Sequence, residues 1–270
     1  MLSVVSIQQI TSCTWSYDAL GQVTAESDAN NTAYHRGFAY DAIGNRLASI
    51  EGNTDPTQPG ATTYTPTALN QYSQISVPSV VPTYDADGNQ LASQIRPLGA
   101  SSLESCLFVW DGENRLIEIK DATGANSLAK YTYDSQSRRI ARTVGTTSLV
   151  TLYDGWNPVI DFTTLDFSTF DLQTVNLWGL DLSGSMQGAG GVGGLLSVTS
   201  TAGTYYPTYD GNGNVSEYLD AAGATVAHYE YDAFGNIIFS SGPSASSFRH
   251  RFSTKPQDAE SGLYYYGYRY

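Results

Sequence analysis

The sequence contains little positive charge, and this scarcity excludes one class of partner. Its 270 residues include 13 Lys and Arg against 26 Asp and Glu, for a formal net charge of −13 at pH 7. Binding to nucleic acid needs clustered basic side chains that neutralise phosphates. The one local basic cluster, Arg138, Arg139 and Arg142, is better explained as the solvated face of a strand. We therefore expect no nucleic-acid partner.

Cysteine and histidine are scarce as well, which argues against metal and redox sites. The two cysteines, Cys13 and Cys106, lack C-x-x-C spacing. The three histidines, His35, His228 and His250, lack metal-ligand spacing, and no G-x-S-x-G nucleophile motif accompanies them. We interpret the histidines as surface or strand residues, and we expect no catalytic residue, no metal and no cofactor.

Long apolar runs are also missing. No stretch approaches the ~20 apolar residues of a membrane-spanning helix, and no useful window shows helical periodicity. Residues 1–5 lack the basic start of a signal peptide. We therefore expect no membrane span, and we expect the chain to begin inside a longer protein.

The abundant residues are Tyr and Gly, 20 and 26 in number, and many of them recur in one short motif. The motif Tyr-Asp-x-x-Gly-Asn occupies residues 40–45, 84–89 and 231–236, and Tyr-Asp-Gly-Asn-Gly-Asn occupies residues 209–214. The leading aromatic residues commonly lie about 23 residues apart, a period that indicates a repeat architecture. Looser copies begin at Tyr17, Trp110, Tyr133 and Tyr153.

Each motif predicts a tight turn between two strands. The Asp accepts hydrogen bonds from backbone N–H groups that follow it, and the Gly three residues later takes a positive φ without a Cβ clash. A type I turn followed by a left-handed residue is a common hairpin connection. The residues that we expect to form this structural turn motif are Tyr40, Asp41, Gly44, Asn45, Tyr84, Asp85, Gly88, Asn89, Tyr209, Asp210, Tyr231, Asp232, Gly235 and Asn236.

A second turn recurs about 10 residues after the first, as at Asp220 after Asp210. The segments between the turns are rich in aromatic and aliphatic residues, as strands are. The sequence therefore predicts an all-β fold, an antiparallel hairpin meander that forms a curved sheet or part of a hollow β-shell. We expect the repeated aromatic side chains to pack as cross-strand pairs.

The repeats suggest two parts within one continuous body. Residues 1–161 contain repeats of the Tyr-Asp motif, interrupted within 53–82 by a Pro-rich segment that we expect to be a longer loop. Residues 162–270 first break the rhythm with a Trp- and Gly-rich run and then hold two further repeats.

Two local motifs imitate ligand sites. The run Gly188–Gly193 matches the G-x-G-x-x-G dinucleotide fingerprint, but a strand rather than a helix is expected to follow it, so we interpret it as a close-packed glycine turn. The run Asp85–Asn89 resembles the start of a calcium loop. Gln90 and Arg96 occupy the positions where that loop needs Gly and Glu, so we interpret Asp85 as a turn former.

The Tyr-Asp repeats resemble the YD repeats of Rhs-type proteins. The run from Trp178 through Leu196 and the ending Gly262–Tyr270 closely resemble the Rhs repeat-associated core, and the resemblance covers nearly the whole chain. In that family, consecutive β-hairpins spiral into a large hollow shell, and bacterial members enclose a variable C-terminal toxin in polymorphic-toxin and toxin-complex systems. The aspartate-dependent self-cleavage motif of many members would lie beyond Tyr270.

The resemblance implies a non-catalytic shell segment, a fragment of a longer Rhs protein, that encapsulates and delivers a C-terminal toxin or effector. The implied partners are that cargo, the remaining shell repeats and a delivery machinery, and the implied location is secreted or at the cell surface. One alternative is a cell-surface adhesion module whose outer face, with Trp110 or Trp156, binds glycans or a partner protein. Another is a self-processing protease, which would need residues beyond Tyr270.

Overall fold

The computed structural model describes residues 13–270, and its regular structure consists almost entirely of antiparallel strands. The chain divides into two compact units. One unit ends at Thr83 and includes the turn Asp232–Asn236, and the other comprises Tyr84–Tyr231 and Ile237–Tyr270. Each unit contains one sheet, in which every strand is bonded to its neighbours in the sequence, so the predicted all-β meander is confirmed.

The first unit contains a six-stranded sheet and a short 3₁₀ helix, η1 (Thr32–Tyr34). Phe38 and Ile50 are its buried apolar side chains, and Glu26 is fully buried. The Pro-rich segment that was expected to be a loop contains the short hairpin β5–β6, because Thr and Tyr residues there alternate as in a strand. The strands are β1 (Cys13–Tyr17), β2 (Val23–Asp28), β3 (Arg36–Tyr40), β4 (Arg46–Glu51), β5 (Thr62–Pro66) and β6 (Tyr72–Ile75).

The second unit contains a thirteen-stranded sheet in linear order, with β7 and β19 at its ends. Its strands are β7 (Ala92–Ile95), β8 (Glu104–Trp110), β9 (Leu116–Asp121), β10 (Ser127–Tyr133), β11 (Arg139–Val144), β12 (Thr147–Asp154), β13 (Asn157–Thr164), β14 (Asp171–Trp178), β15 (Leu195–Ser200), β16 (Gly203–Tyr209), β17 (Val215–Leu219), β18 (Thr225–Tyr231) and β19 (Ile237–Ser241).

The two compact units divide after Thr83, whereas the change in repeat pattern along the sequence falls between residues 161 and 162. Strand β13 crosses that position and pairs with β12 and β14 on its two sides. A meander continues its backbone hydrogen bonds from one hairpin to the next, so a change of repeat signature does not by itself interrupt the sheet.

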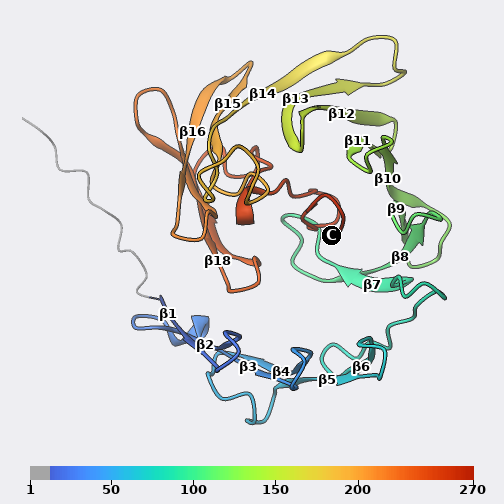
Figure 1. Cartoon of the computed structure of the whole chain (residues 1–270), viewed down its shortest axis with the longest axis vertical. Helices are drawn as coiled ribbons and strands as arrows, with labels where there is room; N and C mark the ends of the chain where they lie inside the picture. Colours follow the sequence, from blue (N-terminus) through green and yellow to red (C-terminus); the bar gives the residue numbers. More distant parts are fainter. Residues whose placement is uncertain (1–12) are drawn as a thin grey trace, which may run out of the picture. The chain divides into compact units, whose positions relative to one another are not determined.

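The C-terminal residues 242–270 lie against one face of the thirteen-stranded sheet, and the sheet bends around them. Figure 1 shows the strands of this unit, β7 to β18, following one another around the C-terminus. The segment contains one short 3₁₀ helix, η2 (Phe252–Thr254), and is otherwise irregular. Its backbone groups therefore need partners outside a regular ladder.

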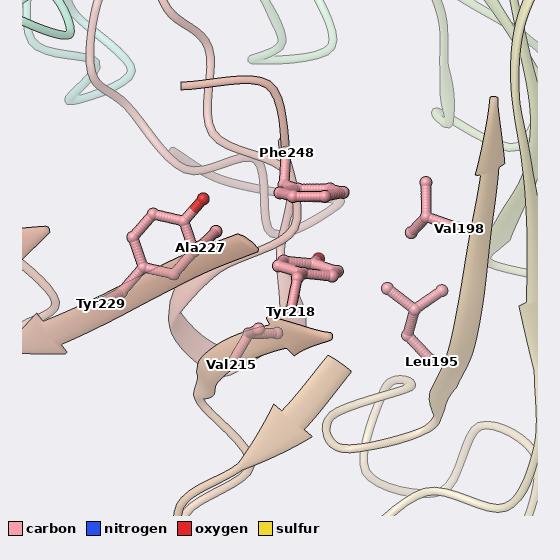
Figure 2. Packing of buried hydrophobic residues seen from close by; sticks show 7 residues of the cluster. All are labelled: Leu195, Val198, Val215, Tyr218, Ala227, Tyr229 and Phe248. Carbon is pink, nitrogen blue, oxygen red and sulfur yellow. The ribbon is translucent and has the colours of Figure 1, made fainter. Parts of the chain in front are cut away.

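Two apolar clusters form the core of this unit. One joins β15, β17 and β18 to the C-terminal segment, and Figure 2 shows the Phe248 ring lying parallel to the Tyr218 ring, with centroids 3.8 Å apart. Such a pair contributes about 0.5–1.5 kcal/mol beyond its area burial. The other cluster is centred on Ile119 and Leu116 of β9. No helix among residues 13–270 is long and apolar enough to cross a membrane.

Candidate functional site

The repeated Asp organises each turn through its carboxylate. In the turn after β3, Asp41 Oδ1 accepts the backbone N–H groups of Ile43 and Asn45 at 3.0 and 2.8 Å, and Asp41 Oδ2 accepts the Asn45 side-chain amide at 2.8 Å. The bond from the Asn45 amide is the main cause that lowers the pKa of Asp41 below its usual 3.8. The carboxylates of Asp85, Asp210 and Asp232 receive the same set of bonds.

The residue three places after the Asp has a left-handed backbone. Gly44, Gly88 and Gly235 have φ values of 93°, 90° and 87°. Asn114 and Ser137, which follow Asp111 and Asp134, also take this conformation, with φ values of 60° and 61°. Glycine is favoured there because it pays no Cβ penalty, and the two non-glycine turns are looser copies in the sequence as well.

In three of the repeats, the leading aromatic residue bonds to a backbone carbonyl in or just before the preceding strand. Tyr231 Oη donates to the Val215 carbonyl at 2.8 Å, and Tyr133 Oη donates to the Leu116 carbonyl at 2.6 Å. The indole N–H of Trp110 donates to the Gln90 carbonyl at 2.8 Å. Sequence reasoning expected only ring packing. The choice of Tyr or Trp over Phe at this position was the signal for a polar bond.

The C-terminal segment replaces the missing ladder with bonds to several parts of the second unit. Val215 N–H of β17 donates to the Arg251 carbonyl at 3.0 Å, and Leu98 N–H donates to the Ala259 carbonyl at 2.7 Å. The Thr254 hydroxyl donates to the Gly213 carbonyl at 2.8 Å. Leu98 follows β7 and Val215 begins β17, near opposite ends of the sheet, so the segment ties distant parts of the curved sheet together.

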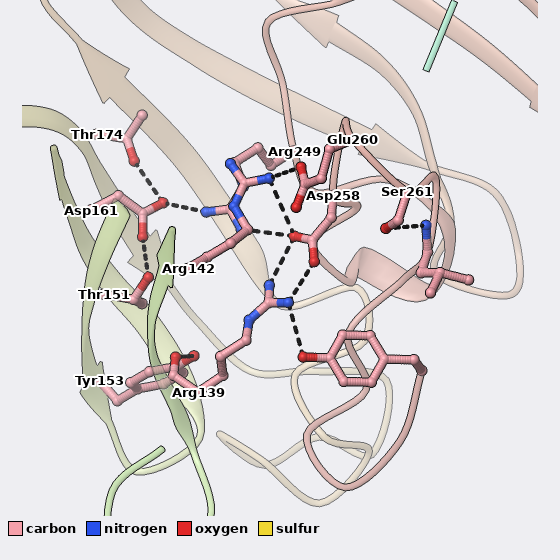
Figure 3. A network of polar contacts seen from close by, with 12 residues as sticks. Arg139, Arg142, Thr151, Tyr153, Asp161, Thr174, Arg249, Asp258, Glu260 and Ser261 are labelled. Carbon is pink, nitrogen blue, oxygen red and sulfur yellow. Dashed lines mark hydrogen bonds and ion pairs between the residues drawn. The ribbon is translucent and has the colours of Figure 1, made fainter. Parts of the chain in front are cut away.

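A buried charge cluster holds the middle of this segment, and Figure 3 shows how its side chains converge. Arg139 of β11 forms a two-point ion pair with Asp258, in which Nη2 lies 2.9 Å from Oδ1. Arg142 of the same strand pairs with Glu260. Arg249 pairs with Asp161 of β13 at 3.1 Å and lies 3.6 Å from Asp258. Three guanidinium groups thus face three carboxylates in one place.

The cluster corrects the expectation that Arg138, Arg139 and Arg142 form a solvated strand face. Arg138 lies in the turn before β11, half-buried and paired with Asp134 of the same turn. Arg139 is 4% exposed, and Arg142 is largely covered by the C-terminal segment. The expectation was wrong because Arg138 has a partner in its own turn and the partners of Arg139 and Arg142 lie more than a hundred residues away in the sequence.

The pKa values of the two neighbouring carboxyls, Asp258 and Glu260, shift in opposite directions. Burial acts to raise the pKa of Asp258, but the charges of Arg139 and Arg142 outweigh it and hold that pKa below 3.8. Burial and the nearby Asp258 charge raise the pKa of Glu260 above 4.5. Because guanidinium groups neutralise these carboxylates, the arrangement fixes the segment in place and offers no exposed acid or base.

The two motifs that imitate ligand sites take the conformations expected of them. The Gly188–Gly193 run is a loop between the antiparallel strands β14 and β15, with no βαβ unit around it, and Asp181 Oδ2 accepts the N–H groups of Ala189 and Gly191. Asp85 Oδ1 accepts the backbone N–H of Asn89 within its own turn. Within residues 13–270, no three His, Cys, Asp or Glu side chains gather in a way that could hold a metal ion.

His250 corrects the expectation that the histidines lie at the surface or in strands. It lies in the C-terminal segment, is 4% exposed and has its ring 5.6 Å from that of Trp178. Burial, and secondly the charge of Arg249, lower its pKa to about 3, so the ring is neutral. The burial of His250 could not be predicted from the sequence, where its immediate neighbours are Arg249 and Arg251.

Together these features define a class of protein: an antiparallel β-meander of Tyr-Asp turns whose C-terminal segment packs against the thirteen-stranded sheet. The family model for the RHS repeat matches residues 209–238. The chain is 27% identical over 260 residues to the tRNA3(Ser)-specific nuclease WapA of Bacillus spizizenii and 26% identical over 260 residues to the tRNA nuclease WapA of Bacillus subtilis. Each alignment covers 94% of this chain and 10% of the relative.

Two solved structures are similar at lower identity. One is the Photorhabdus luminescens Tc holotoxin pore, at 16% identity and a TM-score of 0.45, covering 95% of this chain and 16% of that one. The other is the TcdB2–TccC3 complex, at 16% identity and a TM-score of 0.41, covering 99% of this chain and 18% of that one. The RHS-repeat match and the WapA relatives support the resemblance of this chain to Rhs-type YD-repeat proteins. The chain spans about a tenth of the length of the curated relatives it matches.

Proposed function

We propose that this chain is a non-catalytic wall segment of an Rhs shell, and that the longer protein uses the shell to enclose and deliver a C-terminal toxin or effector. The observation that carries the proposal is the fixed position of residues 242–270 against the face around which the thirteen-stranded sheet bends. In a longer protein, the chain that follows would start from this face, where a cargo would be enclosed.

The non-catalytic role is supported by the way the polar residues are used. The repeated aspartates are occupied by turn hydrogen bonds, and the buried carboxylates Asp161, Asp258 and Glu260 are paired with arginines. The relatives are named as tRNA nucleases, and this chain matches only a tenth of each. We assign the nuclease activity of such proteins to a part that this chain does not match, and we expect the whole protein to act outside the cell or at its surface.

The test uses the natural full-length protein that contains this chain. Intact mass under native and denaturing conditions, followed by limited digestion, should reveal a C-terminal polypeptide that resists protease while the shell is folded and is cut once urea unfolds it. Complete digestion of the C-terminal part in the native protein, at the rate seen in urea, would rule out enclosure.

Two variants connect that test to the structure. Arg139→Met breaks the buried pair that holds the C-terminal segment to β11 and should make the enclosed part accessible to protease. Arg115→Met removes a partly exposed pair with Asp111 inside a turn and should leave protection unchanged. Equal protection in both variants would show that the segment does not close the shell.

A further inference from the structure

A cavity of about 220 Å³ lies in the second unit, where the C-terminal segment crosses the loop between β14 and β15. Six aromatic rings line it: Tyr153, Trp156, Trp178, Tyr265, Tyr266 and Tyr268. An engineered apolar cavity of about 150 Å³ is large enough to take up benzene, so this one has room for a somewhat larger ring system.

Hydrogen bonds hold two of the aromatic walls, Trp156 and Trp178, in place. Trp156 lies in the two-residue turn between β12 and β13, and the Gln187 side chain fixes this turn by accepting Trp156 N–H at 3.1 Å and donating to the Asp154 carbonyl at 2.8 Å. The Trp178 indole N–H donates to the Pro158 carbonyl at 2.8 Å. Such a pre-formed pocket binds a planar ring without the entropic cost of ordering its walls.

Trp156 and Tyr268 form one corner of the cavity. Their ring centroids lie 4.8 Å apart, with the rings tilted by 48°. A Cβ atom on Gly267 would lie 3.2 Å from Trp156 Cζ3, so the backbone there runs directly against the indole ring. The corner is therefore made from two separate segments of the chain, which explains why the sequence gives no local motif for it.

Two polar groups in the lining give the cavity a chemical preference. His250 is buried and neutral, and its Nε2 atom has no hydrogen-bond partner, although a buried polar atom normally has one. Lys255 is the one charged side chain among the described residues that line the cavity, and its ammonium group donates to the Gly190 carbonyl. The remaining N–H groups of an ammonium can bind an anion.

We infer that this cavity is a binding site for a planar aromatic ring system that carries an anionic group. The ring stacks within the aromatic walls, His250 Nε2 bonds to a polar atom of the ligand, and Lys255 binds the anion. A cationic ligand is disfavoured because Lys255 would repel it, despite the attraction of aromatic faces for cations. The same chemistry is carried by a free aromatic carboxylate and by an aromatic residue next to an acidic residue in a polypeptide.

The test titrates the full chain, by ligand-observed NMR, with three probes that share one ring. Indole-3-acetate should bind saturably and more tightly than its neutral amide, indole-3-acetamide, and tryptamine, which is cationic, should bind most weakly. A fourth probe, the blocked dipeptide acetyl-Asp-Trp-amide, presents the same ring and a carboxylate on a peptide backbone. Tighter binding of the dipeptide than of indole-3-acetate identifies a polypeptide as the source, and the reverse order identifies a free small molecule.

Matched variants locate the binding. Lys255→Met should weaken indole-3-acetate by at least about tenfold, as expected for a lost charge-assisted bond, and leave indole-3-acetamide unchanged. Trp156→Leu should weaken both probes. The controls are Lys130→Met, at a mostly exposed lysine of β10, and Trp15→Leu in β1, which should bind like the parent chain.

The parent chain alone decides the inference even if a variant folds poorly. Absence of saturable binding by both indole-3-acetate and the dipeptide at millimolar concentration would overturn it. So would binding that all four variants leave unchanged. The inference stands apart from the proposed shell function, since the cavity lies entirely within this chain.

Discussion

Arg139 and Asp258 lie 119 residues apart in the sequence and meet in a buried, two-point ion pair. Their side chains are 4% and 0% exposed. Burying two charges costs desolvation energy that their attraction roughly repays, so such a pair adds little net stability, whereas loss of one partner leaves an uncompensated charge. We conclude that the pair chiefly specifies where the C-terminal segment docks on β11.

The first prediction concerns this pair. Arg139→Met should lower the free energy of unfolding by about 3–5 kcal/mol, because it leaves Asp258 buried without its main partner. Arg115→Met, which breaks a partly exposed pair with Asp111, should cost less than about 1 kcal/mol. Urea unfolding followed by tryptophan fluorescence measures both.

The double variant Arg139→Met with Asp258→Leu tests whether the ion pair mainly fixes the docking position of the C-terminal segment or mainly stabilises the fold. If the pair mainly fixes the docking position, the double variant should recover a large part of the stability that Arg139→Met loses. Additive losses from the two changes would contradict that conclusion.

The second prediction compares two glycines of one turn. Gly213 has a φ of 76°, and a Cβ atom there would lie 2.6 Å from Val192 Cγ1. Gly213→Ala should therefore lower the unfolding free energy by at least about 2 kcal/mol, from backbone strain and the steric clash together. Gly211 has open space at its Cβ position, so Gly211→Ala should change the unfolding free energy by less than about 1 kcal/mol. A loss for Gly213→Ala as small as the loss expected for Gly211→Ala would show that the turn tolerates a side chain at its left-handed position.

The turns could be predicted from the sequence because the interactions that form them are local. Asp210 bonds to residues two and four places along the chain, and Gly213 supplies the left-handed backbone at a fixed offset. The period of the motif then gave the antiparallel meander. These steps need no knowledge of distant parts of the chain.

The charge cluster and the aromatic cavity could not be predicted, because both depend on how far the sheet bends. Arg139 meets Asp258 only once the C-terminal segment crosses β11, and Trp156 meets Tyr268 across a similar separation. Alternation along a strand tells which side chains share a face, but not whether a later segment will cover that face.

The third prediction tests the bond made by the repeated aromatic residue. Tyr231→Phe keeps the ring but removes the hydroxyl that bonds to the carbonyl of the fully buried Val215. We expect a loss of about 1 kcal/mol in the free energy of unfolding. The control is Tyr206→Phe, at a side chain that is 46% exposed, which should stay within about 0.5 kcal/mol of the parent. A loss at Tyr231 no larger than at Tyr206 would leave ring packing as the sole role of the repeated residue.

The last prediction concerns acid stability and the glycine loop. Burial acts to raise the pKa of Asp181, but hydrogen bonds from the Ser183 hydroxyl and from the N–H groups of Gly191, Ser183 and Ala189 outweigh it and lower that pKa to about 2. The folded-state pKa lies below the ordinary value of 3.8. The ionised carboxylate therefore stabilises the fold at every pH above the ordinary value, and this contribution is lost as the pH falls through the folded value.

Asp181→Asn should consequently be less stable than the parent at neutral pH, by on the order of 2 kcal/mol, and the difference should shrink between about pH 4 and pH 2. Urea unfolding at a series of pH values measures this difference, in which the titration of the other carboxyls cancels. Asp171→Asn, at an exposed residue of β14, serves as the control and should stay within about 0.5 kcal/mol of the parent at neutral pH. If the difference in unfolding free energy between Asp181→Asn and the parent does not change with pH, the negative charge of Asp181 does not stabilise the glycine loop. The shape of the Asp181 side chain would then be sufficient.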